Sequence, residues 1–120
     1  MKQTIVLDFD GVIHSYSSGW KGADIIPDQP TLGAADAINF LRQTYNVVCV
    51  SSRCHQPGGI AAICAWMEKH GIQVDEVTAN KPPHIVVVDD RALRFDGDWQ
   101  KVIDGIPAAS VPWNKKSNQP

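Results

Sequence analysis

The stretch that decides the fold is residues 4–12, which read Thr-Ile-Val-Leu-Asp-Phe-Asp-Gly-Val. Its first four residues are β-branched or aliphatic, and such a run predicts a short buried strand. The next four, Asp-Phe-Asp-Gly, form a polar turn with a glycine, which predicts the end of that strand. We therefore expect two carboxylates, those of Asp8 and Asp10, at the carboxyl end of a strand in the core.

Beyond this stretch, apolar runs of strand length alternate with segments of helical periodicity. Further strands are expected at 47–50, 74–78, 85–88 and 108–111. Helices are expected from Thr31, which can act as an N-cap, from about Pro57, and over 98–103. Alternating strands and helices favour right-handed crossovers and a mostly parallel sheet. The sequence thus predicts an α/β fold, a Rossmann-like three-layer sandwich with about five strands.

Apolar residues at helical spacing predict which side of two of these helices faces the core. The first helix carries such a stripe at Leu32, Ala35, Ile38, Leu41 and Tyr45. The second carries one at Ile60, Ile63, Cys64 and Met67, and Gly71 is expected to end it.

Composition and charge narrow the class of protein. The chain has 120 residues, of which 43% are hydrophobic and 20% charged, a balance typical of one globular domain. We expect the core to occupy 1–111 and residues 112–120 to form a polar tail that is disordered. The formal net charge of -2 gives no overall electrostatic reason to expect nucleic-acid binding, although a local basic patch remains open.

The sequence also bears on location. It has no run of the ~20 apolar residues that a membrane span needs, and its first residues do not resemble a signal peptide. Its three cysteines show no CxxC spacing, which favours reduced thiols. We therefore expect a soluble, cytoplasmic protein without a membrane partner, as a monomer or small homo-oligomer.

Polar side chains follow three of the expected strands at the point where each ends. Asp8 and Asp10 follow the first strand, Ser51 follows the second, and Asp89 and Asp90 follow 85–88. Because ligands of open α/β sheets bind beyond the carboxyl ends of the strands, we expect these side chains to share one site.

Carboxylates crowded in this way need a cation or raised pKa values to coexist. Oxygen ligands of this kind suit Mg²⁺, which also binds substrate phosphate. A carboxylate can attack phosphorus, and a second carboxyl group two residues on can protonate the leaving oxygen and then activate water. A lysine and a hydroxyl can bind the other phosphoryl oxygens.

Four motifs resemble those of the haloacid dehalogenase superfamily, in the same order. They are Asp8-Phe9-Asp10-Gly11-Val12, Ser51, Lys81 and the pair Asp89-Asp90, which together extend over roughly residues 4 to 90. Ser51-Ser52-Arg53 and Asp89-Asp90-Arg91-Ala92 further resemble small phage and bacterial members. The resemblance implies a magnesium-dependent phosphatase that forms an aspartyl-phosphate, because dehalogenases of the superfamily lack the second aspartate of the first motif.

The resemblance also implies roles for individual residues. Asp8 would be the nucleophile and a metal ligand, and Asp10 the general acid and base with its backbone carbonyl on the metal. Ser51 would donate to the phosphoryl group, with Ser52 as the alternative, and Lys81 would hold the nucleophile and phosphate. Asp90 would bind the metal directly, and Asp89 would support it or bind through water.

Four further residues beside these motifs are candidate substrate-binding residues: Gly11, His14, Ser52 and Arg53. Neither place where the family carries a cap domain has room for one, which implies a capless member with an open site. An open site favours a phosphorylated nucleic-acid end or a nucleotide as substrate. A small phosphorylated metabolite, or a binding protein that does not hydrolyse its ligand, is the alternative. Trp20 in the loop 14–30 is a candidate for stacking on a base, with packing as the other reading.

Overall fold

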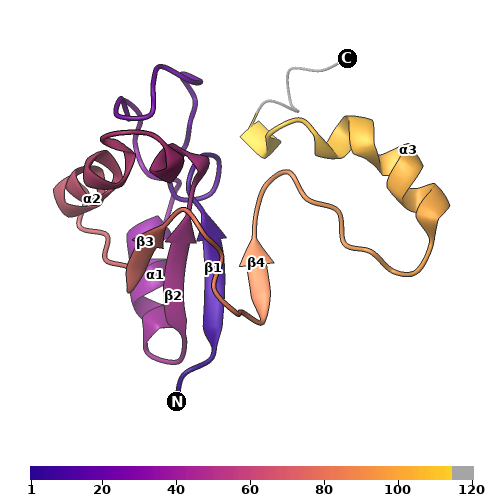
Figure 1. Cartoon of the computed structure of the whole chain (residues 1–120), viewed down its shortest axis with the longest axis horizontal. Helices are drawn as coiled ribbons and strands as arrows, with labels where there is room; N and C mark the ends of the chain where they lie inside the picture. Colours follow the sequence, from indigo (N-terminus) through magenta and orange to yellow (C-terminus); the bar gives the residue numbers. More distant parts are fainter. Residues whose placement is uncertain (115–120) are drawn as a thin grey trace.

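The computed structural model describes residues 1–114 of the chain. Its elements alternate as an α/β fold requires (Figure 1). They are β1 (Thr4–Asp8), α1 (Ala34–Arg42), β2 (Asn46–Val50), the 3₁₀ helix η1 (Ser52–His55), α2 (Gly59–Lys69), β3 (Glu76–Thr78), β4 (Val86–Val88) and α3 (Trp99–Ala109). None of these helices is long and apolar enough to span a membrane.

The four strands form one sheet in the order β3-β2-β1-β4, and every pairing in it is parallel. The sheet confirms the expected α/β class with a parallel sheet. β1 lies inside the sheet, where Leu7 pairs with Cys49 of β2 and with Val88 of β4. The carboxyl ends of β1, β2 and β4 are therefore level, and the residues that follow them begin at one edge.

The expected fifth strand at 108–111 is wrong, because within residues 1–114 the helix α3 continues through 108 and 109. The Asp98 carboxylate caps this helix by accepting hydrogen bonds from the backbone N–H groups of Gln100 and Lys101. The expected end at 103 is therefore also wrong, and the helix runs on to Ala109 with Pro107 inside it. The sheet therefore has four strands in the described part of the chain, rather than about five.

The helix α1 begins three residues later than its sequence suggested. Thr31 does not cap it, because the Thr31 hydroxyl donates to the Val12 carbonyl, 2.6 Å away. Gly33 occupies the N-cap position with a φ of 81°, a left-handed conformation that glycine adopts without strain. Leu32 thus lies before the helix and is fully exposed, so its expected place on the inner face is wrong, whereas Ile38 is buried as expected.

The inner face of α2 is also turned relative to the expected stripe. Ile63 and Met67 are buried as expected, and Trp66 is buried beside them. Ile60 and Cys64 are exposed, so their assignment to the core is wrong. The face is set by the tight entry to the helix, in which Pro57 and Gly58 precede a first residue, Gly59, that packs against the backbone of η1.

The connection between β1 and α1, residues 9–33, is a folded structure that we call the β1–α1 loop. It lies above the carboxyl ends of the strands (Figure 1). Phe9, His14 and Trp66 of α2 pack their rings together with centroids 5.2–5.4 Å apart. Trp66 also donates its indole N–H to the Asp28 carbonyl at 3.0 Å. The loop is therefore fixed to α2 and forms one wall of the strand-end region.

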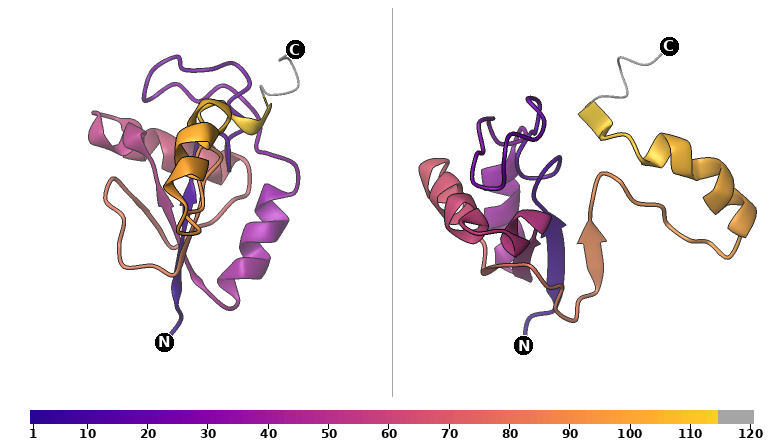
Figure 2. Two further views of the ribbon diagram at one scale, coloured as in Figure 1. Left: turned by 90° about the vertical axis from the view of Figure 1, so that its right-hand side faces the viewer. Right: turned by 45° about the horizontal axis from the view of Figure 1, so that its top comes forward.

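Residues 89–114, which we call the C-terminal arm, extend past the outer edge of β4 and carry α3 away from α1 and α2 (Figures 1 and 2). α3 does not cover a face of the sheet as a third layer would. The arm returns to the β1–α1 loop at its end, where Trp113 donates to the Gly11 carbonyl and Asn114 to the Ser15 carbonyl. Of the expected polar tail, 112–120, residues 115–120 lie outside the described part.

We expect Gly59→Ala to destabilise the protein by about 2–4 kcal/mol, because the added Cβ would lie under 3.0 Å from the Arg53 carbonyl oxygen. Gly71→Ala is the matched control: nothing lies within 4 Å of its Cβ, and it carries only the cost of a φ of 68°, about 1 kcal/mol. Urea denaturation of both variants measures the difference. Equal losses would show that Gly59 is not sterically required.

Candidate active site

Three carboxylates meet at the carboxyl ends of two neighbouring strands. Asp8 is the last residue of β1, and Asp89 and Asp90 directly follow β4, which pairs with β1 through Leu7 and Val88. One oxygen from each of the three carboxylates lies within 4.8 Å of the others. Residues that are distant in the sequence are therefore brought within reach of one ion. We call Asp8, Asp89 and Asp90 the carboxylate cluster.

Gly11 is the residue that allows Asp90 to enter the cluster. Its φ is 89°, a conformation that side chains with a Cβ rarely adopt. A Cβ at this position would lie under 3.0 Å from both oxygens and the carboxyl carbon of Asp90. Gly11 was expected to contact substrate, and in the structure its α-carbon instead faces the Asp90 carboxylate. The glycine of the Asp-Phe-Asp-Gly stretch is thus required for close approach as well as for the turn.

Without a bound cation, the negative charges of the carboxylate cluster repel one another. Burial together with the negative charges of Asp89, Asp90 and Asp10 raises the pKa of Asp8 from its ordinary 3.8 to about 7, against a hydrogen bond from the Phe9 backbone. A bound divalent cation would remove this repulsion. Carboxylate oxygens are the ligands that Mg²⁺ prefers, so the donor set fits the expected ion.

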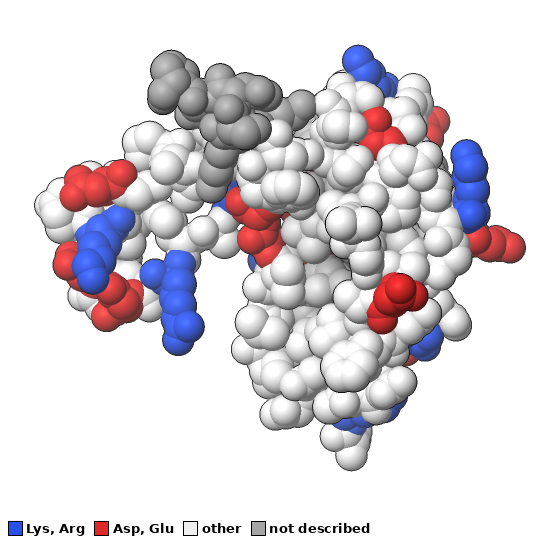
Figure 3. All heavy atoms as spheres, turned by 180° about the vertical axis from the view of Figure 1, so that it is seen from behind, with Lys and Arg blue, Asp and Glu red and all other residues white. Residues whose placement is uncertain are grey.

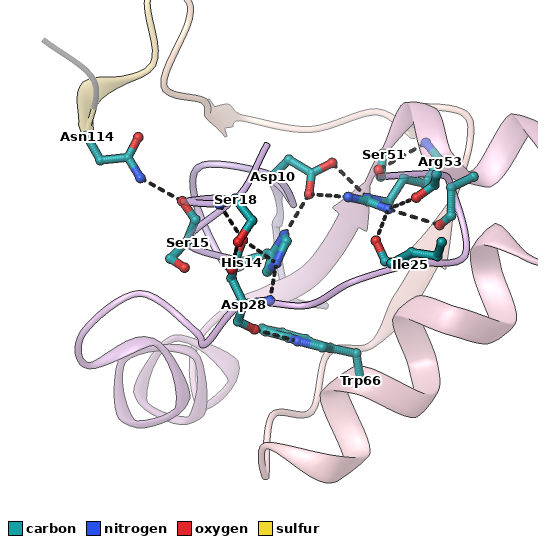
Figure 4. Close-up of polar contacts among 12 residues, drawn as sticks. Asp10, His14, Ser15, Ser18, Ile25, Asp28, Ser51, Arg53, Trp66 and Asn114 are labelled. Carbon is teal, nitrogen blue, oxygen red and sulfur yellow. Dashed lines mark hydrogen bonds and ion pairs between the residues drawn. The ribbon is translucent and has the colours of Figure 1, made fainter. Parts of the chain in front are cut away.

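Asp10 is not part of the carboxylate cluster, and its negative charge is balanced by hydrogen-bonded side chains of the protein (Figure 4). Arg53 donates to both of its oxygens, from Nε at 2.8 Å and from a terminal nitrogen at 3.1 Å. His14 Nδ1 lies 2.8 Å from one of these oxygens. Burial raises the pKa of Asp10, but the hydrogen bonds from His14 and Arg53 outweigh it, so the pKa lies below its ordinary value. Asp10 is therefore held as an oriented carboxylate.

The hydrogen bonds of His14 define its proton position. The backbone N–H of Asp28 donates to Nε2 at 3.1 Å, so this nitrogen carries no proton. Nδ1 must then carry the proton and donate it to Asp10. The ring is completely buried and stacks on Phe9. His14 was expected to bind substrate, and the structure instead gives it the role of orienting Asp10.

Arg53 likewise differs from its expected substrate-binding role. Its side chain is completely buried. Besides binding Asp10, one terminal nitrogen donates to the carbonyls of Gly22, Ala23 and Ile25 in the β1–α1 loop at 2.7–3.2 Å. A guanidinium held by a carboxylate and three carbonyls does not face an incoming phosphate. Arg53 links the end of β2, the loop and Asp10.

The remaining expected residues are less closely gathered. Ser51 is buried after β2, and its oxygen accepts from the Arg53 backbone N–H at 3.1 Å, which leaves the hydroxyl hydrogen available to another acceptor. Ser52 is exposed beside it. Lys81 follows β3 and is exposed, and it makes no hydrogen bond or ion pair with any other residue of 1–114. The structure therefore does not bring Lys81 into contact with the cluster.

A small cavity of about 80 Å³ adjoins both groups of carboxylates. It is lined by Asp10, Tyr16, Trp20, Ser52, Asp90, Arg91 and Pro112. The indole of Trp20 lies over the Arg53 guanidinium, 4.7 Å from carbon to ring centroid, and the side chain is half exposed. Seen from behind, acidic side chains are visible where the C-terminal arm meets the body of the molecule (Figure 3).

Sequence reasoning missed Tyr16 and Pro112 as parts of this cavity. Tyr16 is the only residue other than glycine with a positive φ among the described residues, 59°, and such strain is common beside functional sites. No local pattern marks this conformation in advance. Pro112 reaches the site only because the arm folds back across the chain, which short-range periodicity does not report.

The raised pKa of Asp8 gives a pH-dependent prediction for the protein without divalent cations. Between pH 3.8 and about 7 the folded protein keeps a proton that the unfolded chain has released, so stability falls as pH rises through this window. Asp8→Asn removes the penalty. It should raise the free energy of unfolding by about 1–2 kcal/mol at pH 8 and by less at pH 5.

Thermal melts in a chelating buffer measure this gain, and Asp36→Asn on the exposed first turn of α1 is the control, for which no such gain is expected. Adding Mg²⁺ at pH 8 should stabilise the wild type more than Asp8→Asn. A gain for Asp8→Asn that is the same at both pH values would contradict the repulsion described above.

No protein-family model, curated protein or solved structure matches this chain.

Proposed function

We propose that this chain is a divalent-cation-dependent phosphomonoesterase in which Asp8 attacks the phosphorus. The observation that carries the proposal is the cradle at the end of β1: Asp8 lies within reach of Asp89 and Asp90, and Gly11 has no side chain where Asp90 enters. An acidic cluster alone is common on protein surfaces. Here Asp8 lies at the end of a buried strand inside the sheet, and Gly11 leaves the space that the Asp90 carboxylate occupies. Both features support a specific site rather than a chance surface cluster.

Mg²⁺ is the ion that we propose for the cluster, held by the carboxylates of Asp8, Asp89 and Asp90. When bound, it would offset the repulsion between an anionic nucleophile and an anionic phosphate. The same charge would lower the pKa of Asp8, so that its carboxylate would be ionised at neutral pH and able to attack. The Asp10 side chain contributes no oxygen to the cluster, because its carboxylate is bound by Arg53 and His14. We propose that Asp10 binds the ion through its backbone carbonyl instead.

Side chains of the protein itself would carry out the bond-forming and proton-transfer steps. The Asp8 carboxylate would form the phosphoryl–oxygen bond as the leaving oxygen departs, and water would later cleave that bond. The ionised Asp10, oriented by Arg53 and His14, is suited to accept a proton from this water. The lowered pKa of Asp10 means that its carboxyl group is rarely protonated. Donating a proton to the leaving oxygen in the earlier step is therefore harder for Asp10 than accepting one from water. Ser51 has a hydroxyl hydrogen to offer a phosphoryl oxygen.

The residues that line the small cavity indicate which kind of substrate would fit. Tyr16, Trp20 and Arg91 supply two aromatic rings and a cation beside Asp10 and Asp90. Rings and a guanidinium suit a leaving group with a planar base and further phosphates, which supports a nucleotide or a phosphorylated nucleic-acid end. The loop of 9–33 and the segment of 54–80 contain no additional domain over the site. A small phosphorylated metabolite remains the alternative substrate.

The test of the reaction is turnover of an aryl phosphate with Mg²⁺. We expect Asp8→Asn to lower kcat by at least about 10³-fold, because an amide cannot attack phosphorus, with unchanged far-UV circular dichroism. Asp36→Asn, the same chemical change on α1, should keep wild-type activity. Wild-type turnover that survives exhaustive chelation would contradict the metal requirement. Phosphate binding without turnover would favour a binding protein instead.

Asp10 is tested by the choice of leaving group. Asp10→Asn should slow an alkyl phosphate about 10²-fold or more and slow nitrophenyl phosphate much less, because a nitrophenolate leaves without a proton. Comparing kcat/KM for the two substrates in wild type and variant measures this. Equal losses for both substrates would remove the acid role and leave Asp10 with orientation or water activation alone.

A further inference from the structure

The C-terminal arm and the strand that precedes it expose eight large apolar side chains. Their exposed fractions range from 42% to 69%: Ile85, Val86, Val88, Leu93, Phe95, Trp99, Ile103 and Ile106. No residue of α3 is buried. Apolar patches of this extent on soluble proteins mark interaction sites rather than ordinary surface.

α3 presents one apolar stripe along its length. Trp99, Ile103 and Ile106 recur at the i, i+4, i+7 spacing of a helix face that is normally covered. The polar contacts of α3 lie elsewhere, in the Asp98 cap and in the ion pair between Lys101 and Asp96. Within the arm this face is only partly covered: the Trp99 ring packs against Phe95 at a centroid distance of 4.8 Å, and Ile106 lies beside Leu93. Trp99, Ile103 and Ile106 all remain more than half exposed.

A complementary surface lies on the sheet. Between β4 and α1 runs an apolar groove of about 220 Å³, which we call the β4–α1 groove. Leu7, Ile38, Leu41 and Val88 line its floor and sides, and the fully exposed Leu32 stands at its margin. A groove of this kind accepts the apolar face of an amphipathic helix.

The arm is anchored at both ends beside this groove, and α3 lies between the two anchors. At its start, β4 is paired with β1 through Leu7 and Val88. At its end, Trp113 and Asn114 donate to the carbonyls of Gly11 and Ser15. Between these anchors α3 stands apart from α1 in every view (Figures 1 and 2). In this arrangement α3 does not fill the groove of its own chain.

We infer that the occupant of the β4–α1 groove is α3 of a second copy of this chain, in a two-fold symmetric dimer where each copy provides one helix and one groove. Such an exchange satisfies both apolar surfaces at once, which is the self-complementarity that an isologous interface requires. The exposed parts of the stripe residues Trp99, Ile103 and Ile106 and of the groove residues Leu32 and Val88 amount to an area on the order of 600 Å² per chain, which approaches the ~800 Å² that each partner contributes to a stable interface.

The inference does not depend on the proposed catalytic activity, so its test uses assembly alone. Analytical ultracentrifugation of the full chain at micromolar concentration should show a dimer. Leu32→Asp and Ile103→Asp should each raise the dimer dissociation constant at least tenfold, with unchanged far-UV circular dichroism. Ala108→Asp is the matched control, because Ala108 lies on the side of α3 opposite the stripe, and this variant should remain dimeric.

Disulfide trapping identifies what occupies the groove. Chains with Leu32→Cys mixed with chains carrying Ile103→Cys, both with the exposed Cys64 changed to serine, should form a mixed disulfide dimer on a non-reducing gel. A wild-type monomer would overturn the inference. So would a bond within one chain in the double variant, which would place α3 on its own sheet. Open-ended oligomers would overturn the two-fold exchange.

Discussion

The buried ion pair between Arg53 and Asp10 is the contact on which the rest of the site depends. Arg53 comes from the turn after β2 and Asp10 from the turn after β1, and the same guanidinium donates to three carbonyls of the β1–α1 loop. A completely buried arginine with one partner removed would cost on the order of 3–5 kcal/mol. Removing it would free the loop from β2 and Asp10 from its orientation together.

Because of this pair, the acidic residues at the carboxyl ends of the strands have two different environments. Asp10 receives its positive partners from the protein, and its pKa is lowered by His14 and Arg53 after the opposing effect of burial. Burial together with the negative charges of Asp89, Asp90 and Asp10 raises the pKa of Asp8 to about 7. The pKa values of Asp8 and Asp10, two residues apart, are thus shifted in opposite directions, an arrangement typical of sites in which neighbouring carboxyl groups have different roles.

Part of this arrangement could be predicted from the sequence, because it follows from strand ends. An apolar run that ends in Asp8 and another that ends in Asp89 and Asp90 must meet if the two strands are parallel neighbours, and they are. Arg53 and His14 could not be placed in this way. Their burial depends on how 25 residues of the β1–α1 loop fold over them, and that path is set by Trp66, Asp28 and the carbonyls of Gly22 to Ile25, which no periodicity encodes.

The two halves of the fold differ in how firmly they hold the site. β1 and β2 are joined over five residue pairs and covered by α1, α2 and the loop, so Asp8 and Asp10 project from a packed body. β4 pairs with β1 over three residues, and its valines Val86 and Val88 are close to half exposed. Asp89 and Asp90 therefore reach the cluster from a strand with one neighbour. A cation bound by all three carboxylates would stabilise the pairing of β4 with β1. A surface that covers β4 would likewise restrict the movement of Asp89 and Asp90. Metal binding and burial of the β4 face are thus expected to reinforce each other, because both act on the position of one short strand.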